Sequence, residues 1–307
     1  MIVGILGGSG LYDLEGLTGV GEQVVATPFG APSGPVVTGK VGDGEGDGAV
    51  RLAFIARHGR GHRLLPSEIN YRANIHALKQ LGAEKVISVS AVGSLREGLS
   101  PGDLVVVDQF IDRTHRREST FFGDGVVGHV GYGDPVCALL AGAVHAGALA
   151  LGFDDGRSQD RGRGGTRARA RRAYRGGTYV CMEGPQFSTR AESLLHRSWG
   201  ADVIGMTAAT EAKLAREAEL CFTSLALVTD YDCWHPEEEA VTATSIVEVL
   251  RANVSRAKDI VRRVLPELPR LPECGCGRAA EHAIMTSPEA IPAAARERLR
   301  VLYGRYL

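Results

Sequence analysis

The sequence contains no apolar run that approaches the roughly 20 residues that a membrane-spanning helix needs. It also has no excess of charge. Its 35 basic residues stand against 36 acidic ones, so the chain as a whole offers no attraction to nucleic acid or to an anionic lipid surface. Met1–Leu6 has the pattern of a short strand and carries no basic leader. These absences predict a cytoplasmic protein that binds no membrane.

Cysteine is scarce, and its six copies are scattered except for Cys274-Gly275-Cys276. Most of them stand in apolar segments, where cysteine behaves as a small core residue. A Cys-x-Cys pair can bind a metal or close a small disulfide. A structural zinc site needs four ligands, however, and no second cysteine pair lies near this one along the chain. We therefore predict no metal site.

Short β-rich runs alternate with helical patterns through most of the chain, which predicts an α/β fold with a central, largely parallel sheet covered by helices. With 307 residues and 44% hydrophobic content, the chain can bury a substantial core in one large or two modest domains. The expected strands are Met1–Leu6, Leu52–Ala56, Lys85–Val89, Leu104–Val107, Thr178–Met182, Val203–Gly205 and Cys221–Val228. The expected helices are Ser67–Leu81, Ser188–Trp199, Ala208–Glu219 and Thr244–Leu265.

Two segments depart from this alternation. The stretch 154–177 is rich in arginine and glycine and has the character of an insert. Its only aromatic residue is Tyr174, so it lacks the interleaved rings on which bases would stack, and we interpret it as a solvated loop. The last segment, 266–307, is too apolar to be a free tail. We expect it to pack on its own domain or on a neighbouring subunit, as an extension of one domain over residues 1–265.

The glycine-rich turn Gly7-Gly8-Ser9-Gly10 lacks what either common nucleotide motif requires. A dinucleotide fingerprint would need a third glycine where Asp13 stands, and no Gly-Lys-Ser/Thr follows for a P-loop. What remains is a flexible backbone with a free hydroxyl, which suits a small anion. Other strand ends supply further donors for an anion, namely Arg57, Ser90 and Thr207. Because such strands end at one edge of a sheet, these residues predict a site for a phosphate-containing ligand.

Two carboxylates follow the last expected strand, in Asp230-Tyr231-Asp232. Two carboxylates that lie close together can hold different protonation states, so one can act as an acid while the other stays ionised. Aspartate is also common in turns and helix caps, so the same pattern is open to a purely structural interpretation.

The motifs together resemble the trimeric purine nucleoside phosphorylase and methylthioadenosine phosphorylase family, and most closely its methylthioadenosine branch. They span residues 1 to about 265 in the family's order. They are Gly4–Leu11, Arg57–Gly59, Pro66–Arg72, Ser90–Ser94, Glu183–Ser188, Gly205–Thr207 and Thr229–Trp234. The resemblance implies a single-domain, three-layer αβα fold, a homotrimer or dimer of trimers, and attack of inorganic phosphate on C1′ of a purine nucleoside. It implies no organic cofactor and no metal.

Carried over by motif, the resemblance also implies a role for each site residue. The phosphate contacts would be Ser9, Arg57, His58, Ser90, Ala91 and Thr207. Met206 would lie against the sugar and Phe187 against the base, while His129 would reach the 5′ side from a neighbouring subunit. The family's Met-Thr-x-x-Pro-Glu motif stands here as Met206-Thr-Ala-Ala-Thr-Glu211, and losing proline in the first helical turn should cost rigidity rather than chemistry.

Cleavage of an N-glycosidic bond builds negative charge on the leaving purine, so a proton source is needed at the base. We assign Asp230 as the acid at purine N7 and give Asp232 a hydrogen bond to the exocyclic amine. Family members that prefer 6-oxopurines carry Asn and Glu where Asp230 and Ser188 stand, so this chain is expected to take adenine. A 5′ thiomethyl group would need an apolar pocket, to which Val241 and Ile246 could contribute.

The sequence therefore predicts phosphorolysis of 5′-methylthioadenosine. Two alternatives stay open at this point. One is a broader purine nucleoside phosphorylase that also takes adenosine or inosine. The other is a nucleic-acid-binding member in which the arginine-rich segment 154–177 does the binding, and the intact pocket motifs argue against it.

Overall fold

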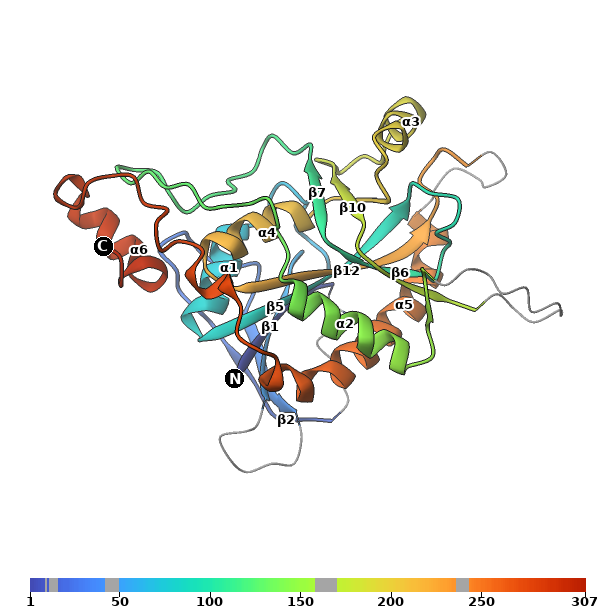
Figure 1. Ribbon diagram of the computed structural model, residues 1–307, viewed down its shortest axis with the longest axis horizontal. Helices are drawn as coiled ribbons and strands as arrows, with labels where there is room; N and C mark the ends of the chain where they lie inside the picture. Colours follow the sequence, from blue (N-terminus) through green and yellow to red (C-terminus); the bar gives the residue numbers. More distant parts are fainter. Residues whose placement is uncertain (9, 11–15, 42–49, 158–169, 236–242) are drawn as a thin grey trace.

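The computed structural model describes residues 1–8, 10, 16–41, 50–157, 170–235 and 243–307 (Figure 1). Its strands are β1 (Ile2–Gly7), β2 (Leu17–Gln23), β3 (Val36–Val41), β4 (Val50–Ala56), β5 (Ala83–Ser94), β6 (Leu104–Val107), β7 (Gln109–Asp112), β8 (Asp154–Asp155), β9 (Arg172–Arg175), β10 (Thr178–Cys181), β11 (Val203–Gly205) and β12 (Cys221–Asp230). Its α-helices are α1 (Tyr71–Gln80), α2 (Ala138–Ala150), α3 (Arg190–Ser198), α4 (Ala208–Glu217), α5 (Ala243–Val264) and α6 (Ala293–Tyr303), and short 3-10 helices cover Leu265–Arg270, Gly275–Arg278 and Pro288–Ala290.

The twelve strands found in the described residues join one mixed sheet. Its main path runs β2-β3-β4-β1-β5-β12-β6-β9-β8. β4, β1, β5 and β12 are mutually parallel along this path, whereas β3 pairs antiparallel with β4 and β6 pairs antiparallel with β12. The predicted mixed, largely parallel sheet is therefore confirmed. The carboxyl ends of its four central strands lie at one edge.

The long strand β5 joins this path to a second group of strands. Its first part pairs with β1 and β12, and its last two residues, Gly93 and Ser94, pair antiparallel with β11. β11 then pairs with β10, and β10 with β7. The ends of β10 and β11 are thereby brought to the same edge as the ends of β1, β4, β5 and β12.

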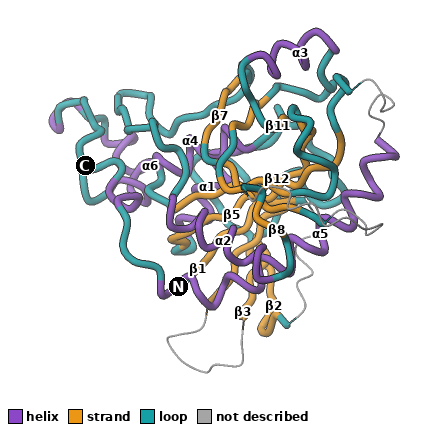
Figure 2. Tube along the Cα trace, turned by 45° about the vertical axis from the view of Figure 1, so that its right-hand side comes forward, coloured by secondary structure: helices purple, strands orange, loops and turns teal. Residues whose placement is uncertain are grey.

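Helices cover the sheet on both faces, as the three-layer prediction requires. α1 and α4 pack against each other on one side, and α2 and α5 pack against each other on the opposite side (Figures 1 and 2). β12 lies between these layers, and its first nine residues are all buried. A strand covered on both faces is apolar along most of its length, which explains the apolar run in the sequence; Thr223 and Ser224 are small polar exceptions. No helix of the described residues is long and apolar enough to cross a membrane.

Several elements escaped the sequence analysis. Helix α2 is apolar on nearly all sides, with glycine and alanine between its leucines, so it shows no amphipathic stripe. The interpretation of 154–177 as one loop is wrong near both ends of this segment. β8 lies near its start and β9 near its end, and the two strands extend the sheet beyond β6. The buried ring of Tyr174 packs in the core there, and residues 158–169 lie outside the described residues.

The C-terminal segment contributes to the core of its own chain. Leu299, Leu302 and Tyr303 of α6 are buried, and the ring of Tyr303 stacks on that of Phe122 with centroids 5.0 Å apart. The same segment pairs with the arm at 113–137, where the backbone N–H of His129 donates to the Ala283 carbonyl at 2.9 Å. The C-terminal segment therefore positions the arm that carries His129.

Helix α1 carries a histidine that folding keeps uncharged. His76 is completely buried, and neither ring nitrogen has a hydrogen-bond partner among the described residues. Burial lowers the pKa of His76 to about 4. The unfolded chain binds a proton there with a pKa near 6.5, so the stabilisation is fully present above that pH and is lost as pH falls toward the folded value.

We therefore expect the free energy of unfolding to fall between about pH 7 and about pH 4, with His76 responsible for up to about 3 kcal/mol. His76→Phe should flatten this fall, and substitution of the exposed His282 by phenylalanine should leave it unchanged. Urea unfolding followed by circular dichroism across this pH range measures the free energy of unfolding of the wild type and of both variants. An equally steep fall in His76→Phe would contradict the assignment.

Candidate functional site

A cavity of about 770 Å³ opens at the carboxyl edge of the central strands. Its walls come from the segments that follow β1, β4, β5, β10, β11 and β12, as the sequence predicted for a single cleft. Nine of the predicted site residues line it: Arg57, His58, Ser90, Ala91, Phe187, Met206, Thr207, Asp230 and Asp232. Residues up to 175 positions apart in the chain meet there because parallel strands end together.

Three of the remaining predicted site residues cannot be placed: Ser9 and Val241 lie outside the described residues, and Ile246 belongs to α5 but its side chain is not described. Ser188 is half-buried, its hydroxyl lies 3.6 Å from the Met182 sulfur, and it does not line the cavity. His129 is exposed on its arm, away from the cavity of its own chain.

One end of the cavity is built for an anion. Ser90 presents a buried hydroxyl that has no hydrogen-bond partner among the described residues. Thr207 occupies the N-cap of α4 and makes no side-chain cap, so the helix does not use its hydroxyl, and the residue lines the same cavity. Gly8 and Gly10 bring bare backbone to the cavity wall. The two hydroxyls and the glycine backbone together form a phosphate-binding arrangement.

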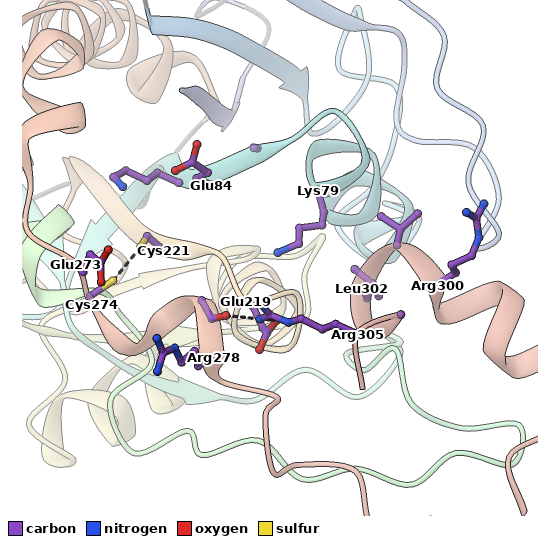
Figure 3. A pocket seen from close by; sticks show the side chains of 15 residues that line it. Lys79, Glu84, Glu219, Cys221, Glu273, Cys274, Arg278, Arg300, Leu302 and Arg305 are labelled. Carbon is purple, nitrogen blue, oxygen red and sulfur yellow. Dashed lines mark hydrogen bonds and ion pairs between the residues drawn. The ribbon is translucent and has the colours of Figure 1, made fainter. Parts of the chain in front are cut away.

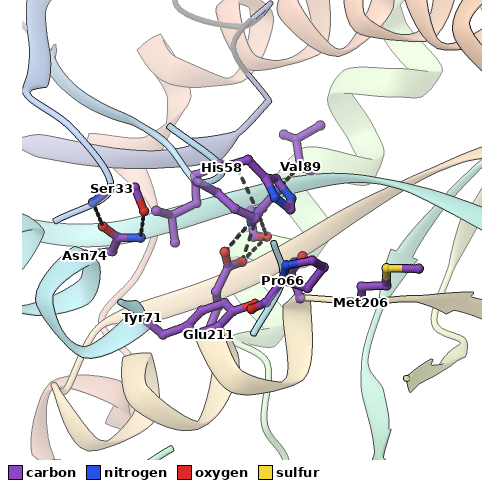
Figure 4. A network of polar contacts seen from close by, with 12 residues as sticks. Ser33, His58, Pro66, Tyr71, Asn74, Val89, Met206 and Glu211 are labelled. Atoms are coloured by element: carbon purple, nitrogen blue, oxygen red, sulfur yellow. Dashed lines mark hydrogen bonds and ion pairs between the residues drawn. The ribbon is translucent and has the colours of Figure 1, made fainter. Parts of the chain in front are cut away.

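Arg57 is held by a buried carboxylate below this anion site. Its Nε and Nη2 donate to Glu211 at 2.5 and 3.0 Å, and Nη1 donates to the Val89 carbonyl at 2.9 Å. Figure 4 shows Glu211 reaching from α4 toward Val89 of β5 and toward His58, which lies in the turn after β4. Burial lowers the pKa of Arg57, but the charge and hydrogen bonds of Glu211 outweigh it and leave the pKa raised. The guanidinium of Arg57 is therefore permanently charged and held in a fixed position at the wall of the site.

His58 is neutral in the structure. Its Nδ1 lies 2.9 Å from the Leu64 carbonyl, which can only accept, so Nδ1 carries the proton and Nε2 is left as an acceptor. Burial lowers the pKa of His58 to about 4, and the nearby Arg57 charge adds to the effect. The ring is also stacked on His62, with centroids 4.2 Å apart. Such an imidazole can accept a hydrogen bond from the P–OH group of a phosphate monoanion.

The other end of the cavity carries the two aspartates. Oδ1 of Asp230 accepts from the backbone N–H of Asp232 at 2.8 Å, and Oδ2 accepts from the Thr229 hydroxyl at 2.6 Å. The first of these bonds closes an Asx turn, so the structural interpretation of this motif also holds. The turn aims both carboxyl groups at the cavity. Gly93 makes this approach possible, because a Cβ there would meet Asp230 Oδ1 at 2.9 Å.

The two carboxyl groups differ in their surroundings. Burial raises the pKa of Asp230, and the neighbouring Asp232 charge raises it further against the hydrogen bonds from Thr229 and Asp232. Asp232 holds a left-handed backbone conformation with φ of 53°, and its Oδ2 is buried without a partner among the described residues. Asp230 is therefore the group that can carry a proton, and Asp232 offers a free acceptor oxygen.

Two residues that organise the site were missed from the sequence. Glu211 was visible only as the last member of a motif, and Arg117 stands in a region without any signal. Arg117 is almost fully buried and joins the segments after β10 and β11, because its guanidinium donates to Glu183 and to the carbonyl of Met206. The partners are 66 and 89 positions away, too far for local patterns to reveal the contact.

The fold is an α/β fold whose central strands end at one cavity, and this cavity holds an anion site and two carboxyl groups. Comparison with known proteins identifies the family of this enzyme. Residues 2–266 match the model of the phosphorylase superfamily. The chain belongs to that superfamily.

Its curated relatives match along their whole length. The chain is 53% identical to an S-methyl-5′-thioadenosine phosphorylase of Koribacter versatilis, over 99% of this chain and 96% of that protein. It is 51% identical to the corresponding protein of Geobacter sulfurreducens, over 100% and 99%.

Solved structures with the same fold are also methylthioadenosine phosphorylases. A methylthioadenosine phosphorylase from an antarctic soil metagenomic library superposes with a TM-score of 0.87 at 44% identity, covering 98% of both chains. A methylthioadenosine phosphorylase from Schistosoma mansoni in complex with adenine gives a TM-score of 0.81 at 36% identity, covering 92% of this chain and 96% of that one.

Proposed function

We propose that the protein catalyses phosphorolysis of 5′-methylthioadenosine by inorganic phosphate, giving adenine and 5-methylthioribose 1-phosphate. It is a pentosyltransferase of the phosphorylase superfamily, and its relatives at about half identity carry the methylthioadenosine activity in their names. The observation that carries the assignment is the raised pKa of Asp230, opposite an anion site in the same cavity.

The reaction follows from the two ends of the cavity. Phosphate, held at Ser90 and Thr207, lies beside the sugar and stabilises the positive charge that develops there. As the C1′–N9 bond breaks, a phosphate oxygen bonds to C1′ and the electron pair passes to the purine. Asp230 gives its proton to N7, so the base leaves neutral and the carboxylate remains. No organic cofactor or metal takes part in this scheme, and phosphate is the co-substrate.

Selectivity for adenine rests on the same two carboxyl groups. The free Oδ2 of Asp232 can accept from the exocyclic amine of adenine. A 6-oxopurine would place a carbonyl oxygen there, and two opposed acceptors would cost about 1–3 kcal/mol. Phe187, which is half exposed at the rim of the cavity, offers an apolar face to the base.

We further propose that the 5′ side of the site is completed by His129 of a neighbouring subunit in a homotrimer. His129 stands on an exposed arm next to Val127 and opposite Met285, whose exposed fractions are 53% and 67%. Apolar side chains exposed on an extended arm are typical of a subunit interface. We also propose that the protein is cytoplasmic, because no disulfide joins any of its six cysteines.

Adenine release from 5′-methylthioadenosine should require phosphate and should produce one pentose 1-phosphate per adenine. Release of adenine should exceed release of hypoxanthine from inosine by about 10-fold or more in kcat/KM, because of the acceptor clash at O6. A coupled assay of the free base, with phosphate present or omitted, measures both. Undiminished release without phosphate would instead identify a hydrolase, and equal efficiencies for the two nucleosides would identify a broad purine nucleoside phosphorylase.

A further inference from the structure

Four of the six cysteines gather at one point of the fold, far from the nucleoside cavity. The sulfurs of Cys137, Cys221, Cys274 and Cys276 all lie within 4.8 Å of one another. Cys221 is the first residue of β12 and Asp230 is the last, so the cluster lies at the opposite end of that strand, about 30 Å away. No part of the proposed catalytic scheme uses these thiols.

The spacing of the sulfurs fits a tetrahedral metal site. Zinc binds thiolates at about 2.3 Å, which places the four sulfurs of a tetrahedral four-cysteine site about 3.8 Å apart. The Cys221 and Cys274 sulfurs are 3.2 Å apart, and those of Cys137 and Cys274 are 3.9 Å apart. Three of the four cysteines are buried, and the fourth, Cys274, reaches the surface. Four protein ligands leave no open position for a substrate, so such a site would be structural.

The surroundings favour a site of negative charge. Zinc bound by four thiolates carries a net charge of −2. Cys221 and Cys274 also line a neighbouring cavity, where five basic side chains stand against three acidic ones. Figure 3 shows Lys79 and Arg278 among these basic side chains, with Cys221 and Cys274 in contact at its edge. Cys137 lies at the N-terminus of α2, where the helix dipole stabilises a thiolate.

Zinc binds cysteine as the thiolate, so binding would displace protons from the thiols of the cluster, and the metal affinity should fall as pH falls.

We propose that Cys137, Cys221, Cys274 and Cys276 bind one structural zinc ion per subunit. The ion would tie the C-terminal segment, through its Cys-x-Cys pair, to the start of α2 and to the start of β12. Along the chain, only Cys276 lies close to Cys274, so the sequence predicted no metal site. In the fold, Cys221 and Cys137 reach Cys274 from 53 and 137 positions away.

The experiment measures zinc in untagged protein purified from zinc-supplemented medium under reducing conditions. We expect about one zinc per subunit by atomic emission, and little in Cys274→Ser and Cys276→Ser. Cys233→Ser, which changes a thiol outside the cluster, should keep the full content. Replacement of zinc by Co²⁺ should give the thiolate charge-transfer and visible bands of a tetrahedral cobalt–thiolate centre in the wild type.

Two further measurements use the wild-type protein alone, so the test does not depend on whether a variant folds. A chelator should release the zinc and lower Tm, and thiol titration of the stripped, denatured chain should find all six cysteines free. A chain that holds no zinc, or that shows four or fewer thiols because cluster cysteines are joined in disulfides, would overturn the proposal. None of these readouts depends on the nucleoside activity.

Discussion

Asp230→Asn lowers kcat for 5′-methylthioadenosine by about 10²–10⁴-fold, the usual contribution of a positioned general acid. The amide keeps the size of the side chain, and its oxygen can still accept from the Asp232 N–H, but its nitrogen cannot accept from the Thr229 hydroxyl. It has no proton to give to N7. The wild-type kcat/KM should also fall as pH rises through the raised pKa of Asp230, because only the protonated carboxyl can act as the acid. This alkaline fall should be absent in the variant. Steady-state assays across pH measure both effects.

Asp232→Asn is the matched comparison, because it changes the second carboxyl group of the same turn. An asparagine there still offers an oxygen to the exocyclic amine, so we expect a rise in KM and a loss in kcat of no more than about 10-fold. The relative efficiency for inosine should also rise in Asp232→Asn, since an amide there can donate to O6. If both variants lost kcat equally, the assignment of Asp230 as the single acid would be wrong.

Glu211→Gln should destabilise the fold by about 3–5 kcal/mol, the cost of leaving a buried charge without its partner. Arg57 is only 2% exposed, and in this variant it loses the charge of its partner and at least one of its two hydrogen bonds to residue 211, because an amide has one accepting oxygen. Phosphate bound in the adjoining site should restore part of the loss, because it supplies a new anion next to the guanidinium. Urea unfolding with and without phosphate measures the effect, and phosphate should stabilise the variant more than the wild type.

Glu217→Gln is the control on the same helix. Glu217 is also buried, but its carboxyl accepts only from the Phe121 N–H and the Thr120 hydroxyl and faces no cation among the described residues. Burial raises the pKa of Glu217, so a neutral amide is a close substitute and should cost about 1 kcal/mol. Equal losses in the two variants would mean that the Arg57–Glu211 pair contributes nothing beyond ordinary burial.

Local patterns predicted the elements that carry the site. The strands β1, β4, β5 and β12 follow from apolar runs that end in glycine or polar residues, and α4 and α5 follow from their periodicity. Helix α1 begins at Tyr71 rather than at Ser67, because Asn70 accepts from the Ala73 N–H and caps the helix. Strands β2, β7 and β9 were missed, because they are rich in polar residues or glycine and only pairing with a neighbour makes them strands, and the valine-containing strand β3 was missed as well.

The sequence by itself determined the order of the strands and helices, the residue types at the strand ends, and the family to which the chain belongs. These are local properties, set by periodicity, by turn residues and by motifs of a few positions. The tertiary structure alone decided which distant groups meet: Arg57 with Glu211 across 154 positions, and Cys137 with Cys274 across 137. Ion pairs and metal sites need contact in space, and no local pattern records which charge or which thiol the folded chain will bring alongside.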